Sequence, residues 1–235
     1  MGCRTTVSTH ANQVLPPDNR ITMMGWTGSP IDGIGVASQS LARDLSLSPS
    51  YELLQAFVPE LQALRIAGSE RHLQCLSGKT KRPAEGCWAK GSLRIEIVAV
   101  FWWTAAKPTE PFGVSWLGGA GNLSVDCTSK SATGEAPGGC MVSTVSSTNN
   151  TGVTGSTMPV LPVATSVVRI HTIVDHSVIE TVVNNRSAMV SWSVNARSAA
   201  QTDVGLFGGS DVNGTITTWD LRDTGNNNAT NHREL

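Results

Sequence analysis

The chain has 235 residues, with 17 Lys and Arg against 18 Asp and Glu, for a formal net charge of -1. This balance excludes a nucleic-acid partner held through a basic surface. Hydrophobic residues make up 40% and charged residues 15%, so the chain can bury a core, and its length suits one large all-β domain or two small ones. The longest apolar run, residues 95–103, is far shorter than the roughly 20 residues of a membrane-spanning helix.

The first segment with a recognisable pattern covers residues 51–65. Its leucines give it helical propensity, whereas Pro59 interrupts a helix, so a short strand followed by an extended or single-turn linker fits equally well. The charged pairs Arg43-Asp44 and Arg222-Asp223 adjoin β-like runs. We interpret both pairs as solvated faces or strand edges.

Two further segments follow in the chain. Residues 93–101 alternate apolar and charged side chains in their first half, which predicts a half-buried strand that becomes fully buried towards Phe101. Residues 129–162 are rich in Ser, Thr, Gly, Asn and Pro, which predicts a long surface loop or a partly disordered insertion.

The clearest β pattern covers residues 167–194. Three runs rich in Val and Ile are separated by Asp175-His176-Ser177 and Asn184-Asn185-Arg186, which predicts a meander of antiparallel strands. The tail, residues 224–235, is polar and is expected to fray.

Few residues offer chemistry. Asp175-His176-Ser177 contains the residue types of a hydrolytic triad, but neighbours on an extended chain point to opposite faces, so a polar turn is the better interpretation. The five cysteines form no Cys-x-x-Cys pair, and the histidines lack metal-ligand spacing. We therefore expect no metal site and no cofactor. Cys75 with Cys87, and Cys127 with Cys140, could each close a loop disulfide, or they could be unpaired thiols.

Signals for the cellular compartment disagree. The first ten residues contain no apolar segment of the kind found in secretory signals. In contrast, five Asn-x-Ser/Thr sequons favour a glycoprotein of extracellular or vacuolar ancestry. They begin at Asn122, Asn149, Asn185, Asn213 and Asn228. The sequence thus leaves localisation open.

Three stretches form a pattern when taken together. They are Arg20-Ile21-Thr22-Met23-Met24-Gly25-Trp26, then residues 35–47 with their continuation to Leu64-Arg65, and finally residues 170–183. In order and spacing these stretches resemble glycoside hydrolase family 32, the invertases, fructan hydrolases and other β-fructofuranosidases. The chain departs from the family at Val36 and Ala42, where the family has Trp and Pro.

The resemblance implies an all-β fold in which a C-terminal antiparallel β-sandwich follows the last strands of a truncated five-bladed β-propeller. It assigns residues 1–50 to a remnant of the last propeller blades and residues 51–70 to a connector. Residues 71–223 would form the sandwich, with a flexible loop near 129–162, and residues 224–235 the frayed tail.

In that family, hydrolysis with retention uses an Asp nucleophile in Asn-Asp-Pro-Asn-Gly, an acid/base Glu in Glu-Cys and an Asp in Arg-Asp-Pro. Such chemistry needs two carboxylates about 5 Å apart. None of the three motifs occurs in this chain. We therefore expect no catalytic residue and no hydrolase activity from this polypeptide alone. Trp26 matches a family position near the fructosyl subsite and would touch substrate only beside a complete propeller.

Two roles remain as hypotheses. The first is the C-terminal sandwich of a sucrose- or fructan-hydrolysing enzyme, which would form a homodimer or associate with a propeller-bearing chain through an exposed apolar face. The alternative is a stand-alone, lectin-like module that stacks sugars on exposed tryptophans, although most of these residues are expected in the core. The candidate tryptophans are Trp88, Trp102, Trp103, Trp116, Trp192 and Trp219.

Overall fold

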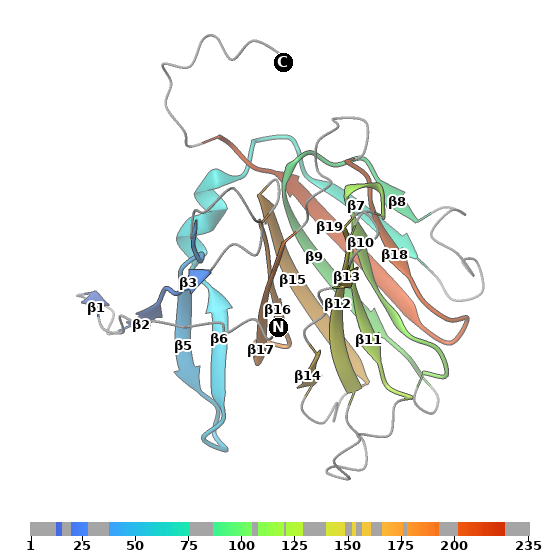
Figure 1. Cartoon of the computed structure of the whole chain (residues 1–235), viewed down its shortest axis with the longest axis horizontal. Helices are drawn as coiled ribbons and strands as arrows, with labels where there is room; N and C mark the ends of the chain where they lie inside the picture. The colour runs from blue at the N-terminus through green and yellow to red at the C-terminus, as the bar shows by residue number, and fades with distance from the viewer. Residues whose placement is uncertain are drawn as a thin grey trace.

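The chain folds into antiparallel sheets with short helical turns (Figure 1). The computed structural model describes residues 13–15, 20–27, 38–75, 87–104, 108–119, 121–128, 140–148, 152–153, 157–160, 166–175, 178–192 and 202–223. Within these ranges the helical segments are two 3-10 turns, η1 (Pro59–Leu64) and η3 (Leu117–Gly119). Neither turn has the length that a bilayer-crossing helix requires. The expected all-β sandwich is confirmed.

One sheet of the sandwich has six strands in the order β17-β16-β15-β9-β19-β7. They are β7 (Arg71–Cys75), β9 (Arg94–Trp102), β15 (Val167–Asp175), β16 (Val178–Val183), β17 (Ser187–Trp192) and β19 (Asn213–Asp220). The predicted meander is therefore confirmed as β15, β16 and β17, which pair consecutively. Asp175 and Val178 pair at the end of the first hairpin, whereas His176 and Ser177 lie outside the described residues.

The facing sheet has the order β13-β12-β11-β10-β18-β8, and β14 pairs with β12 beside this path. Its strands are β8 (Trp88–Ala89), β10 (Phe112–Trp116), β11 (Gly121–Asp126), β12 (Cys140–Thr148), β13 (Gly152–Val153), β14 (Thr157–Val160) and β18 (Val204–Phe207).

The main core lies between these two sheets. Ile95, Ile97 and Ile170 from the first sheet are fully buried against Val114 and Val125 from the second. Alternation along each strand sends every second side chain into this core, because successive side chains in a strand point to opposite faces. The chain thus forms the two-layer packing that defines a β-sandwich.

One sequence expectation is wrong in part. Residues 140–148, placed in a surface loop by their Ser/Thr-rich composition, form β12 and pair with β11 along six residue pairs. Cys140, Val142 and Thr144 are buried at alternate positions. The strand can therefore contain many small polar residues, because only the side chains at its inward positions pack in the core. Residues 129–139 lie outside the described part.

A smaller sheet precedes the sandwich. It has the order β1-β2-β5-β6. Between β2 and β5 in the sequence, β3 and β4 pair with each other as a two-stranded ribbon. The strands are β1 (Gln13–Leu15), β2 (Arg20–Met23), β3 (Trp26–Thr27), β4 (Ser38–Gln39), β5 (Arg43–Leu47) and β6 (Leu53–Phe57). We call β1, β2, β5 and β6 the N-terminal sheet.

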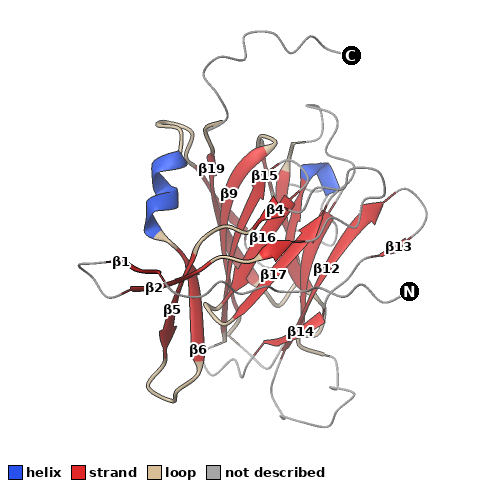
Figure 2. Cartoon of the chain, turned by 60° about the vertical axis from the view of Figure 1, so that its left-hand side comes forward, coloured by secondary structure: helices blue, strands red, loops and turns tan. Residues whose placement is uncertain are grey.

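The segment 51–65 resolves into a strand and a helical turn. Residues 53–57 form β6, Val58 is extended, and η1 begins at Pro59. Proline suits the first position of a helical turn because it has no backbone N–H to leave unpaired. Figure 2 shows η1 above the N-terminal sheet and beside the end of β19, where Arg222 N–H donates to the Leu64 carbonyl at 2.8 Å.

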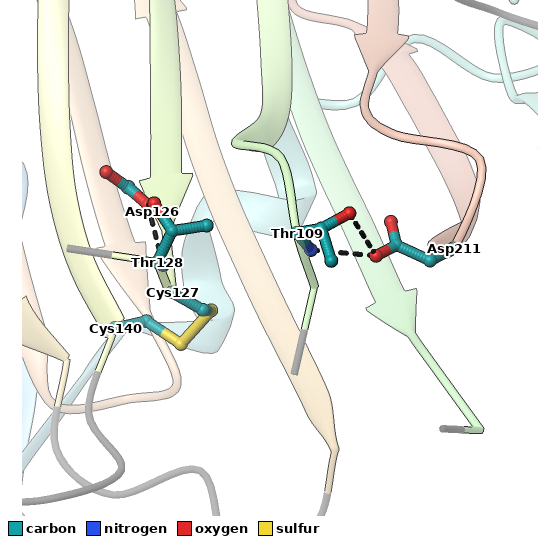
Figure 3. Close-up of a disulfide and its surroundings, with 6 residues drawn as sticks. All are labelled: Thr109, Asp126, Cys127, Thr128, Cys140 and Asp211. Atoms are coloured by element: carbon teal, nitrogen blue, oxygen red, sulfur yellow. Dashed lines mark hydrogen bonds between the residues drawn. A yellow bond between two sulfur atoms is a disulfide. The ribbon is translucent and has the colours of Figure 1, made fainter. Parts of the chain in front are cut away.

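Two disulfides join pairs of strands. Cys127 and Cys140 connect the end of β11 to the start of β12 (Figure 3). Cys75 and Cys87 connect β7 in one sheet to the residue that precedes β8 in the other. This second disulfide therefore links the two layers of the sandwich at the edge where both of these strands lie.

Candidate functional site

The N-terminal sheet and η1 cover part of the outer face of the six-stranded sheet. Phe57 of β6 forms a small apolar cluster with Ile173 of β15 and Val182 of β16, and Leu41, Leu61 and Leu221 pack around it. Alternation places Ile173 and Val182 on the sheet face opposite the main core. We call this contact the junction.

A buried carboxylate lies at the junction. Glu96 on β9 has a side chain that is only 3% exposed. Its two oxygens accept hydrogen bonds from Arg65 Nε at 2.7 Å and Arg65 Nη2 at 2.8 Å, and one of them also accepts from His171 Nε2 at 2.8 Å. We call the N-terminal sheet together with η1 and Arg65 the N-terminal part. Because Arg65 follows η1, this bidentate ion pair connects the N-terminal part to the sandwich.

Aromatic rings enclose the ion pair. The Arg65 guanidinium lies 3.8 Å from the centroid of the Trp219 ring, and the Phe57 ring meets His171 edge-on at 4.9 Å between centroids. A guanidinium over a tryptophan face is attracted by the ring's quadrupole and loses little hydration there. These contacts hold Arg65 in the geometry that its pair with Glu96 requires.

A second buried carboxylate lies two strands away. Glu180 on β16 is 3% exposed and accepts the Leu41 N–H at 2.6 Å. Arg43, itself only 8% exposed, contributes favourable charge and donates to Gln55 at 3.3 Å. Burial raises the pKa of Glu180, although the Leu41 hydrogen bond and the Arg43 charge oppose that shift.

Coverage by the N-terminal part overturns two sequence expectations. Along β9 the outward side chain of Glu96 is buried, whereas Val98 and Val100, further towards Phe101, are only partly buried. The strand is therefore more enclosed in its charged half, the reverse of the expected order. Arg43 is likewise buried and not part of a solvated face, because β5 places it against β16.

The two carboxylates lie in one row across the sheet. Ile173 pairs with Glu96 on one side and with Glu180 on the other, which separates their backbones by about 10 Å at the usual strand spacing. One carboxylate is held ionised and the other has a raised pKa, as in an acid/base pair. Both are buried under the N-terminal part and already hydrogen-bonded, however, so this arrangement serves as a structural tie between the sheets.

The ion pair at Glu96 should make stability sensitive to acid. Burial raises the pKa of Glu96, but the hydrogen bonds from Arg65 and His171 outweigh it and lower the pKa from 4.5 to about 2. A depressed carboxyl pKa contributes stability that is present above the unfolded value and is lost as pH falls through the folded value. We expect urea unfolding to show a steep fall in stability between about pH 4.5 and pH 2, and a shallower fall in Glu96→Gln. An unchanged slope in Glu96→Gln would contradict this assignment.

The structure does not gather the other residues that the sequence singled out. Trp26 pairs with Gln39 in the β3–β4 ribbon, and its side chain lies outside the described part. Asp175 is exposed at the end of β15 and pairs with Arg94 at 3.1 Å. Asp223, also exposed, pairs with Arg94 at 2.7 Å.

None of the tryptophans whose side chains the structure describes is fully exposed. Trp103 and Trp116 are buried in the main core, and Trp219 is covered by Arg65. Trp88 and Trp102 are half-buried, and the Trp192 side chain lies outside the described part. Over the same ranges no three His, Cys, Asp or Glu side chains come together as metal ligands.

Sequence reasoning missed the residues of the junction, although a signal was present. Glu96 lies between two isoleucines, and Glu180 lies in a run of valines and isoleucine. A charged residue inside an otherwise apolar strand needs a buried partner. The partners, Arg65 and Arg43, are remote in sequence, so only the fold reveals them.

Comparison with known proteins identifies the fold. No family model and no curated protein matches the sequence. Solved structures do match, at 12–13% sequence identity. Sucrose-6-phosphate hydrolase from Lactobacillus gasseri aligns with 88% of this chain at 13% identity and a TM-score of 0.60. Exo-inulinase from Aspergillus awamori aligns with 87% at 12% identity and 0.61, and β-fructofuranosidase from Schwanniomyces occidentalis with 86% at 12% identity and 0.59.

These alignments cover 39%, 41% and 45% of the three solved chains. The chain therefore spans less than half the length of the proteins it resembles. In class, it is an antiparallel β-sandwich preceded by a small sheet. More specifically, its fold is similar to the C-terminal region of glycoside hydrolase family 32, so the resemblance inferred from the three sequence stretches is confirmed at the level of fold.

Proposed function

We propose that the chain acts as the C-terminal, non-catalytic part of a sucrose- or fructan-hydrolysing assembly, in which a propeller-bearing chain supplies the catalytic carboxylates. The fold likeness supports the enzyme class, and the absence of the three catalytic motifs supports inactivity of this polypeptide by itself. On this proposal the junction holds the N-terminal sheet in the orientation that the propeller requires, and Trp26 lies near the sugar.

The observation that carries the proposal is an apolar surface on the N-terminal sheet. Ile21, Leu47 and Leu53 are 49%, 62% and 52% exposed. Leu47 pairs with Leu53, and Ile21 pairs with Leu45, two residues from Leu47, so all of these side chains share one face. The same face buries Phe57 at the junction. We call the exposed end of this face the apolar face.

The occupant that best suits the apolar face is a propeller. Exposed apolar patches of this kind mark surfaces that bind other polypeptides. The solved chains with the same fold carry more than half of their length outside the aligned region, which supplies the additional polypeptide. Tyr51, 84% exposed in the β5–β6 hairpin, extends the surface. Self-association through this face is the alternative outcome.

The proposal predicts association without hydrolysis. Purified chain should release no fructose from sucrose or inulin, and it should bind a propeller-bearing chain in co-purification. Leu47→Asp with Leu53→Asp should weaken binding at least about tenfold, or 1.4 kcal/mol, because charge on the apolar face must be desolvated. Ile66→Asp, at an exposed apolar residue outside this face, is the matched control and should leave binding unchanged.

Three results would contradict the proposal. Fructose release by the purified chain would place a catalytic site within it. Equal binding by the double variant and the control would remove the role of the apolar face. A fluorescence response of the chain to sucrose, inulin or levan would favour the lectin-like alternative, which the burial of Trp103 and Trp116 does not support.

A further inference from the structure

Three of the five sequons have their asparagine in the described part, and these differ in exposure. Asn185 is exposed in the turn between β16 and β17, whereas Asn122 and Asn213 are half-buried within strands. Asn122 has neighbours on both sides, Ser115 on β10 and Val145 on β12. A bulky glycan needs an asparagine that projects from the surface, which Asn185 satisfies best.

The turn presents Asn185 in a fixed conformation. Arg186 N–H donates to the Val183 carbonyl at 2.9 Å, and the two central residues, Asn184 and Asn185, have φ of 50° and 56°. Asparagine tolerates this left-handed region better than most residues. The Asn184 side chain accepts the Arg169 N–H at 2.7 Å, so Asn184 faces the sheet while Asn185 is exposed.

The same turn covers the free edge of the N-terminal sheet. Strand β6 is an edge strand, and Gln55 on it donates its backbone N–H to the Asn185 carbonyl at 2.7 Å. The Gln55 side chain donates to the Arg186 carbonyl at 3.1 Å, and Arg186 pairs with Glu52 at 2.7 Å. Asn185 therefore lies directly beside an edge that could otherwise pair with another chain.

A second, independent observation concerns the compartment. Both disulfides join cysteines that lie in strands or directly beside them. Disulfides persist in oxidising compartments such as the endoplasmic reticulum and the extracellular space, and the endoplasmic reticulum is where asparagine acquires its glycan. The redox chemistry and the sequon thus point to the same route through the cell.

We propose that Asn185 carries an N-linked glycan that shields the edge of β6 from pairing with other chains. The glycan projects from the turn without disturbing the hydrogen bonds of Gln55 and Arg186, because those use backbone carbonyls and the Arg186 side chain.

The acceptor is tested by secretion of the full chain from yeast behind a cleavable signal, followed by intact mass measurement before and after treatment with a peptide-N-glycosidase, which hydrolyses the amide bond between the asparagine and its glycan. We expect the treatment to remove glycan mass and to convert Asn185 to Asp. Asn185→Gln and Ser187→Ala should each lose one glycan. Ser187→Ala keeps Asn185 in the turn, so its loss of glycan cannot be attributed to altered folding. Ser124→Ala, which disrupts only the Asn122 sequon, should retain the Asn185 glycan.

Recovery of an unmodified peptide containing Asn185 from the secreted, folded protein would overturn the site. The shielding role is tested with Leu47→Asp and Leu53→Asp present, so that the apolar face no longer contributes to association. In that background, glycan-free Ser187→Ala should self-associate at a concentration about tenfold lower than the glycosylated chain, a difference of about 1.4 kcal/mol. Equal association of the two proteins would overturn the shielding.

Discussion

Replacement of Arg65 by alanine is expected to lower the free energy of unfolding by about 3–5 kcal/mol, the usual cost of removing one partner from a buried ion pair. The variant leaves Glu96, 3% exposed, with His171 as its remaining side-chain partner. It also removes the cation that covers Trp219. Urea unfolding monitored by circular dichroism measures the loss.

Arg94 provides the control, because it is also an arginine paired with carboxylate but its two partners are exposed. Asp175 and Asp223 are 64% and 57% exposed, so Arg94→Ala should cost only about 0–1 kcal/mol. A second test separates the ion pair from simple packing. Arg65→Met combined with Glu96→Met should recover much of the stability lost in Arg65→Ala, because no unpaired charge remains buried. If Arg65→Ala cost no more than Arg94→Ala, the junction would not depend on this ion pair.

Removal of the disulfide between the two sheets is expected to cost about 2–5 kcal/mol. In Cys75→Ser with Cys87→Ser, the unfolded chain gains the freedom that the cross-link denies it. The folded state also loses the covalent link between β7 and β8, of which β8 has only two residues. We expect a lower urea midpoint and faster hydrogen exchange at the β7 and β8 amides.

The Cys127–Cys140 disulfide is the natural comparison, because it joins two strands of the same sheet. Cys127 and Cys140 are separated by 13 residues and Cys75 and Cys87 by 12, so loop-closure entropy predicts almost the same loss for either pair. The exchange pattern should differ, because β11 and β12 remain joined by their own backbone ladder. If removal of Cys127–Cys140 also accelerated hydrogen exchange at the β7 amides, then the faster exchange there would not be specific to the loss of Cys75–Cys87. That result would contradict a local role for the link between the sheets.

The sequence predicts those parts of the fold whose signals are local. The meander of β15, β16 and β17 follows from runs of β-branched residues separated by polar turns, and its strands pair consecutively as expected. Strand β12 was not predicted because its buried residues, Cys140, Val142 and Thr144, belong to a segment that is rich in serine and threonine and therefore has the composition of a loop.

The junction could not be predicted, for a physical reason. Whether Glu96 is solvated depends on η1 and on Arg65, which lies 31 residues earlier in the chain than Glu96. Leu41 donates to Glu180 across a separation of 139 residues. A strand's own alternation reveals which side chains share a face but not what covers that face. The burial of charge at the junction is therefore a property of the tertiary structure alone.

The position of β19 constrains the order in which the protein can fold. This strand, near the end of the described chain, lies between β9 and β7, which precede it by about one hundred residues or more, and it joins the edge strand β7 to the rest of the sheet. Contacts this distant close slowly. A ribosome must release residues 213–220 before β7 acquires its neighbour, and until then β7 and β9 expose edges that chaperones would have to protect.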